Sequence, residues 1–314
     1  MNSIKYIFII SISVCVYGCW EEPDYPVDNL NPPLSGKIIG TDHFEELNLL
    51  DLSTKNSISY EIADYETRPT WSNDGAKFAF YNYKQSSKDD DSIKIITINN
   101  NSIKSWKIDK TGLLGGRCDL TWSPDGNTLA YLNYLDGAQN INYLNTSTGD
   151  LTKIPLPIWF TAISWNPDDD KIILCQGKHY YLSDSITYSF YAMAPYATDI
   201  ENISPFASVT KKWYYNSSDP LHMDWSLDGN MLLISRHLDE IYVLNYIEKS
   251  FHMIPTPVRG HSACWSKDGF YVLYTNWRWV SIDNAVNDLH VTNIDGSFDY
   301  ILRANYKSNL VDWY

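Results

Sequence analysis

Six charged or imidazole side chains share one kind of position in this sequence, a few residues before a tryptophan. They are Arg68 before Trp71, Arg117 and Asp119 before Trp122, His222 before Trp225, and Arg259 and His261 before Trp265. A guanidinium offers paired donors to a carboxylate, so arginines mixed with histidines suit anion recognition. If these positions meet in space, we expect a polar ring that binds an anion. The alternative is that the same side chains cap strand ends and bond to nearby backbone.

The histidines of this set also raise the question of a metal. His222 and His261 could act as metal ligands, but the whole chain holds 7 histidines and no third ligand presents itself. The acidic run Lys88–Asp91 lacks the alternating oxygen-ligand spacing of a calcium loop and is expected to be a solvated loop. We therefore predict no metal and no cofactor.

The tryptophans themselves belong to a repeated segment. The clearest copy is TWSPDGNTLAYLNY, which begins at Thr121, and related copies begin at Thr70, Ser164, Asp224 and Cys264. In each copy a Trp is followed by a turn and then by an apolar run, the pattern of a β-hairpin. Asp bonds back to backbone amides in such turns, and Gly supplies the residue with positive φ. The third copy has Asp169 in place of the Gly, so we expect positive φ there.

The spacing of the repeats predicts the fold class. Successive tryptophans lie 51, 43, 60 and 40 residues apart, and Trp313 follows 48 residues after the last of them. Periods of about 40 to 50 residues with several strands are typical of β-propeller blades. The N-terminal segment from residue 37 matches the second half of a repeat. We therefore predict an all-β, six-bladed propeller over residues 37–314, its last blade closed by a C-terminal strand, 310–314, and N-terminal strands.

The Trp-Ser-Pro-Asp-Gly hairpin resembles the WD40-like repeat of the TolB β-propeller, over about residues 36–314. Within that resemblance the same blade serves in periplasmic scaffolds, in the propeller halves of serine peptidases, and in lyases that act on uronic-acid oligosaccharides. The sequence contains no G-x-S-x-G, H-E-x-x-H or C-x-x-C motif and no phosphate-binding loop. The resemblance therefore implies the fold more strongly than any one activity.

A propeller has two faces, and the repeat assigns its parts to them. The Asp-Gly turns between first and second strands all lie on one face, which we call the turn face. The polar ring lies at the other, the opposite face, where we expect a site.

Two long segments, 204–220 and 276–286, are expected to be loops on that face. Their aromatic and cationic residues form a second candidate binding set: Phe206, Trp213, Tyr214, Tyr215, Trp277, Arg278 and Trp279. The alternative is that these aromatics fold over the blade edges as a satellite core.

The N-terminal residues indicate export and lipidation. Residues 1–19 have one Lys, a short apolar run and the ending Val-Tyr-Gly-Cys, which resembles a bacterial lipobox with Cys19 as the lipidated residue. Residues 20–36 are acidic and rich in proline, as in a tether or an acidic export tag. We expect a protein attached by lipid to the outer membrane of a Gram-negative bacterium, facing either the periplasm or the surface.

Composition limits the partners and the redox chemistry. The net charge of −14 and the sequence pI near 4.8 argue against nucleic acid, because phosphate binding needs clustered cations. Beyond the N-terminal segment, Cys118, Cys175 and Cys264 are expected to be buried and unpaired.

The function predicted from these observations is that of a monomeric, non-catalytic binding scaffold for an envelope protein or a glycan, with lipid as its only membrane contact. The alternative is a lyase-like enzyme that acts on acidic oligosaccharides through Arg117, His222 and His261.

Overall fold

The structure is a computed structural model that describes most of the repeat region. The described residues are 34–42, 46–61, 68–82, 92–108, 120–135, 137–180, 185–198, 204–212, 221–236, 240–258, 260, 262–281, 284–306 and 308–314. The predicted signal segment and lipobox (1–19), residues 20–33 of the predicted tether (20–36) and the Lys88–Asp91 run lie outside them. Within the described part of the chain, no helix has the length and apolar character needed to cross a membrane.

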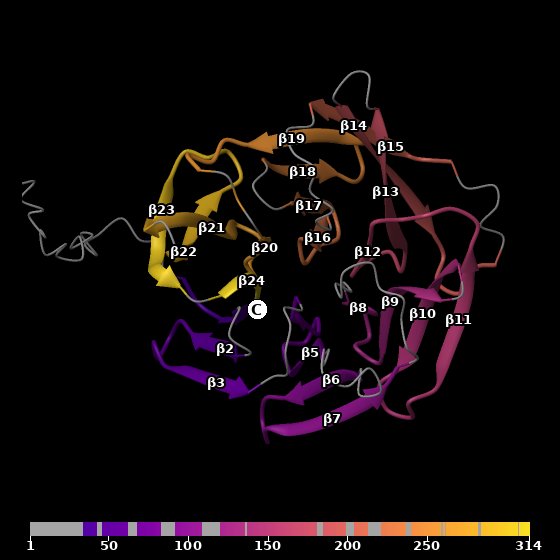
Figure 1. Ribbon diagram of the computed structural model, residues 1–314, viewed down its shortest axis with the longest axis horizontal. Helices are drawn as coiled ribbons and strands as arrows, with labels where there is room; N and C mark the ends of the chain where they lie inside the picture. Colours follow the sequence, from indigo (N-terminus) through magenta and orange to yellow (C-terminus); the bar gives the residue numbers. More distant parts are fainter. Residues whose placement is uncertain are drawn as a thin grey trace, which may run out of the picture. The chain divides into compact units, whose positions relative to one another are not determined.

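Six four-stranded antiparallel sheets stand around a central axis, as predicted (Figure 1). Blade 1 contains β4 (Thr70–Trp71), β5 (Lys77–Asn82), β6 (Ser92–Thr97) and β7 (Ser102–Lys107). Blade 2 contains β8 (Leu120–Trp122), β9 (Thr128–Leu135), β10 (Ala138–Asn145) and β11 (Leu151–Leu156). Blade 3 contains β12 (Ala162–Trp165), β13 (Ile172–Tyr180), β14 (Ser185–Met193) and β15 (Ala207–Lys212).

The second half of the ring repeats this arrangement. Blade 4 contains β16 (His222–Trp225), β17 (Met231–Ser235), β18 (Ile241–Asn245) and β19 (Ser250–Ile254). Blade 5 contains β20 (Ala263–Trp265), β21 (Tyr271–Ser281), β22 (Asn284–Asn293) and β23 (Asp299–Tyr306). Blade 6 joins β24 (Ser308–Trp313) to β1 (Lys37–Asp42), β2 (Glu46–Asp51) and β3 (Ser57–Glu61).

The sixth blade confirms the predicted closure of the ring. Strand β24 is innermost and pairs with β1, with Ile38 opposite Trp313 and Gly40 opposite Val311. The Lys37 and Tyr314 backbones bond to each other in both directions, and the Trp313 indole Nε1 donates to the Ser35 carbonyl at 3.0 Å. The C-terminal strand therefore lies at the centre of the ring (Figure 1).

The predicted turn, with an Asp that bonds back to backbone amides and a Gly of positive φ, is confirmed in four of the five copies. In the first, the Ser72 hydroxyl donates to Asp74 at 2.6 Å, the Ala76 amide donates to the same carboxylate oxygen, and Gly75 has φ of 64°. Equivalent Ser-Asp bonds close the turns that contain Gly126, Gly229 and Gly269. These bonds lower the pKa of Asp74 against the opposing effect of its burial.

The third turn differs from the prediction. Positive φ falls on Asp170, at 49°, and not on Asp169. Asn166 replaces the serine of the other copies, and its side-chain oxygen accepts hydrogen bonds from the amides of Asp168 and Asp169. The Trp165 indole Nε1 donates to Asp170 at 2.8 Å. These bonds shift the left-handed residue one position along the chain.

The core lies between neighbouring blades. Ile141 and Tyr143 of blade 2, for example, pack against Trp165 and Leu174 of blade 3. Cys175 and Cys264 are buried and unpaired, as predicted, and burial raises the pKa of both thiols. Cys118 lies outside the described residues.

Both segments expected to be loops contain strand. Residues 207–212 form β15, the outermost strand of blade 3. Residues 276–281 and 284–286 continue β21 and β22, with Asn276 opposite Asp288 and Trp279 opposite Ala285. The second segment is therefore a long hairpin and not an irregular loop, because its β-branched and aromatic residues continue the pairing.

Candidate functional site

Arg68 crosses from blade 1 to the far side of the ring. Its Nη1 donates to the Met223 carbonyl of β16 at 3.3 Å, and its Nη2 donates to the Ala263 carbonyl of β20 at 3.1 Å. One side chain therefore links blades 1, 4 and 5 through the central channel. His222, the first residue of β16, is buried beside the Met223 bond. Among the residues of the predicted polar ring, Arg68 therefore lies beside β16, the strand that begins with His222.

Two carboxylates share the channel with Arg68: Asp312 is buried, and Asp224 is partly buried. Asp224 of β16 accepts the Trp265 amide at 2.7 Å, and Asp312 of β24 accepts the Trp71 amide at 2.7 Å. Burial raises the pKa of Asp312 to about 7, with a further contribution from the Asp224 charge, while the Arg68 charge and backbone hydrogen bonds oppose the rise. Burial also raises the pKa of Asp224. One guanidinium thus compensates two carboxyl groups.

The same two aspartates belong to a series of bonds between innermost strands. In three places the residue before a Trp accepts the amide of the next Trp along the ring: Asp312 for Trp71, Thr121 for Trp165 at 2.9 Å, and Asp224 for Trp265. These bonds join blade 6 to blade 1, blade 2 to blade 3, and blade 4 to blade 5. Sequence reasoning missed this role. The available signal was the residue before each Trp in the six repeats, which is Thr, Thr, Ser, Asp, Cys or Asp.

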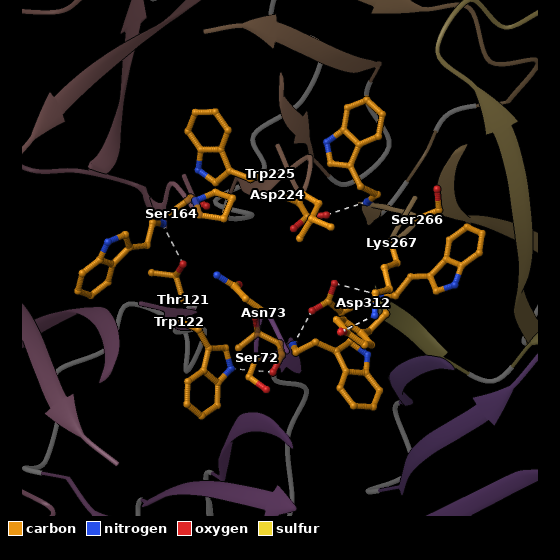
Figure 2. Close-up of a pocket in the computed structure, with 18 residues that line it drawn as sticks. Ser72, Asn73, Thr121, Trp122, Ser164, Asp224, Trp225, Ser266, Lys267 and Asp312 are labelled. Carbon is orange, nitrogen blue, oxygen red and sulfur yellow. Dashed lines mark hydrogen bonds between the residues drawn. The ribbon is translucent and has the colours of Figure 1, made fainter. Parts of the chain in front are cut away.

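A cavity of ≈ 100 Å³ occupies the turn-face end of the channel. Figure 2 shows Asp224 and Asp312 directed into it and the rings of Trp122 and Trp225 directed away. Its rim consists of the residues at the second position of the turns, among them Asn73, Pro167, Leu227 and Lys267, together with Tyr314. The Lys267 ammonium lies 3.8 Å from the centre of the Tyr314 ring. This cavity lies at the turn face, whereas from the sequence we expected a site at the opposite face.

Most of the remaining predicted site residues lie outside the described part of the chain. Arg117, Asp119, Arg259, His261, Trp213, Tyr214 and Tyr215 are among them, and for Trp277, Arg278 and Trp279 only the backbone of β21 is described. Their binding roles stay predictions. In the described ranges, no group of three or more His, Cys, Asp or Glu side chains is placed to hold a metal ion.

Phe206 corrects one expectation about location. It directly precedes β15, its amide donates to the Phe190 carbonyl, and its ring packs edge to face on Tyr246 at 5.5 Å. Tyr246 lies in the turn between β18 and β19, on the turn face. Phe206 is therefore part of the packing between blades 3 and 4, as in the satellite-core alternative, and does not lie in a loop on the opposite face.

No protein-family model matches the sequence, and no curated protein matches it. Several solved structures, however, resemble the structure of this chain. TolB from Acinetobacter baumannii superposes with a TM-score of 0.65 at 14% identity, over 90% of this chain and 67% of that one. The fold is that of a TolB-like propeller.

Two further solved structures, one of a protein complex and one of an enzyme with a bound metal, share this fold. A chain of a nidogen/laminin complex matches with a TM-score of 0.58 at 10% identity, covering 88% of this chain and 97% of that chain. An oligogalacturonate lyase in complex with manganese matches with a TM-score of 0.50 at 13% identity, covering 82% of this chain and 70% of that chain. At these identities the likeness concerns the TolB-like propeller alone and assigns no activity.

Proposed function

We propose that this protein is a lipid-anchored envelope protein whose TolB-like propeller serves as a rigid, non-catalytic scaffold for a partner at the turn-face channel mouth. The observation that supports it is the cavity of ≈ 100 Å³ surrounded by turn residues from different blades. Leu227 is 50% exposed at this rim. A cavity of this size has room for a group larger than a water molecule, such as a small side chain of a partner, since about 10–15 Å³ of water-accessible volume holds one water.

The chemistry of the channel favours a structural use of its charges. The Arg68 guanidinium donates to two backbone carbonyls, and Asp224 and Asp312 accept backbone amides of neighbouring blades. These bonds join blades and hold the rim in one arrangement. A partner therefore meets a surface that is already ordered, which reduces the entropic cost of binding.

A site-specific photo-crosslinker placed at Leu227 in intact cells tests this proposal. We expect a discrete crosslinked product from Leu227 and none from the same group at Ile103, which is 59% exposed on the outer strand of blade 1. Equal products from both positions, or none from either, would contradict a partner at the channel mouth.

The lipid anchor is tested separately. Cys19→Ser is expected to abolish incorporation of labelled palmitate and to release the protein from the membrane fraction. A variant that stays membrane-bound and labelled would show that Cys19 is not the anchor.

The lyase-like alternative makes a different prediction. It requires the release of unsaturated product from acidic oligosaccharides and the loss of that release in His222→Ala. Turnover of that kind would replace the scaffold proposal.

A further inference from the structure

The long hairpin of blade 3 has two unlike faces. Along β14, Ser185, Thr187 and Ser189 alternate with Ile186, Tyr188 and Phe190, the period of two that places polar and apolar side chains on opposite sides of a strand. The apolar set is buried, and Ile186 and Tyr188 pack in the cluster shared with blade 4. The polar set is partly exposed. This hairpin therefore uses one face for the core and presents the other toward solvent.

The polar face extends over three strands, and we call it the hydroxyl face. It consists of Gln176 and Lys178 of β13, Thr187 and Ser189 of β14, and Ser208 and Thr210 of β15. Its hydroxyls bond to each other in rows: Thr187 to Thr210 at 2.6 Å, and Ser208 to Ser189 at 3.1 Å. Three strands spaced by about 4.8 Å give a patch roughly 10 Å across.

An exposed aromatic residue lies near each end of this face. Trp159, in the connection between blades 2 and 3, is 45% exposed and packs on Tyr134 with ring centres 4.6 Å apart. The Gln176 side-chain amide donates to the Trp159 carbonyl at 3.3 Å, which ties Trp159 to the hydroxyl face. Tyr180, at the end of β13, is 43% exposed, with the Lys178 ammonium 5.4 Å from its ring centre.

The combination of groups points to one class of ligand. Ser, Thr, Gln and Lys side chains can donate or accept hydrogen bonds with many hydroxyls, and exposed aromatic faces pack against apolar C–H surfaces. A sugar ring presents both kinds of surface at once. None of the six residues of the hydroxyl face has an aliphatic side chain, although Ile158, next to Trp159, is 40% exposed. Lysines at two positions of the face, Lys178 and Lys212, in a chain of net charge −14, do not supply the clustered cations that nucleic-acid binding needs.

We propose that the hydroxyl face, together with Trp159 and Tyr180, binds a glycan strand. This inference rests on the proposed binding function and names a partner class and a second surface for it. Trp159 and Tyr180 stack on sugar rings at the two ends, and the hydroxyl rows between them bond to the sugar hydroxyls. The strand register places two lysine positions on this face, Lys178 and Lys212, and none of its described residues is a carboxylate, so both neutral and uronic sugars fit.

Calorimetric titration of the full chain with cellohexaose, chitohexaose and hexagalacturonate tests the inference. We expect at least one of the three to bind, with Trp159→Ala weakening that binding by about tenfold and Tyr180→Ala by a smaller factor, in the range of one exposed stacking contact. Thr187→Val, which keeps the shape and removes one hydroxyl, should weaken it several-fold. Trp159→Tyr should retain most of the affinity, which separates loss of stacking from loss of fold.

The matched control is Phe270→Ala, which removes an aromatic ring that is 71% exposed in the turn of blade 5. It should leave glycan binding unchanged. Absence of binding to all three probes, or equal loss in the Phe270 and Trp159 variants, would overturn the inference. The crosslink at Leu227 would be unaffected by either result, so the channel-mouth proposal stands or fails on its own.

Discussion

Two of the joints around the channel make the same bond with different chemistry. Between blades 2 and 3 the Thr121 hydroxyl accepts the Trp165 amide at 2.9 Å, and between blades 6 and 1 the Asp312 carboxylate accepts the Trp71 amide at 2.7 Å. A neutral hydroxyl is thus sufficient to join two blades. The carboxylate adds a buried charge, and the pKa of Asp312 is raised because burial penalises that charge. The difference shows that the acidic joints are coupled to Arg68 and to pH, whereas the threonine joint is not.

The largest effect is expected from removing the cation of this cluster. Arg68→Met leaves the buried Asp312 and the partly buried Asp224 without their guanidinium, and breaking a buried pair typically costs about 3 kcal/mol or more. We expect the free energy of unfolding in urea at pH 7.5 to fall by about that amount. A loss no greater than that of Thr121→Val would show that Arg68 does not compensate the two acids.

The pH dependence of stability is the next largest effect. The Asp312 carboxyl has a pKa of about 7 in the folded chain and 3.8 as its ordinary value, so between these values the folded state binds a proton that the unfolded state has lost. Stability should therefore fall as the pH rises from 4 to 7, by about 2–4 kcal/mol. Below pH 4 the trend reverses, because hydrogen bonds in the turns lower the pKa of Asp125 and Asp228.

Asp312→Asn is the matched variant for this measurement. It keeps an oxygen that can accept the Trp71 amide and removes the titrating group. Its unfolding free energy should vary less between pH 5 and pH 8 than that of the parent. An unchanged slope would assign the pH dependence to other groups.

A smaller effect is expected at the neutral joint. Thr121→Val leaves the buried Trp165 amide without its acceptor, at a cost of about 1–2 kcal/mol. The slope of stability against pH should match that of the parent, since no titrating group changes. Hydrogen exchange at the Trp165 amide should accelerate in this variant, and a protected amide would argue that another acceptor takes its place.

The repeats made the ring predictable, and the reason is local. Each Ser-x-Asp-Gly turn is closed by bonds among five or six consecutive residues, so its hairpin is readable from the sequence. The bond from Arg68 to Met223 joins residues 155 positions apart and exists only once six blades have closed. Neither the residue type nor the spacing identifies that partner. The shift of positive φ to Asp170 likewise depends on a side-chain bond from Trp165 that the repeat pattern does not encode.

The smallest expected effect sharpens the comparison further, because it separates the hydroxyl of Thr121 from its methyl group. Thr121→Ser keeps the acceptor for the Trp165 amide and removes one buried carbon, a loss of about 0.8 kcal/mol. If the Thr121 hydroxyl stabilises the contact between blades 2 and 3, the unfolding free energy of the serine variant should be closer to that of the parent than to that of Thr121→Val. Its Trp165 amide should also stay protected from exchange. If both variants lose the same stability, packing of the methyl group against the neighbouring strand, and not the hydrogen bond, holds blade 2 to blade 3. In that case the acidic joints would differ from this one in mechanism as well as in charge.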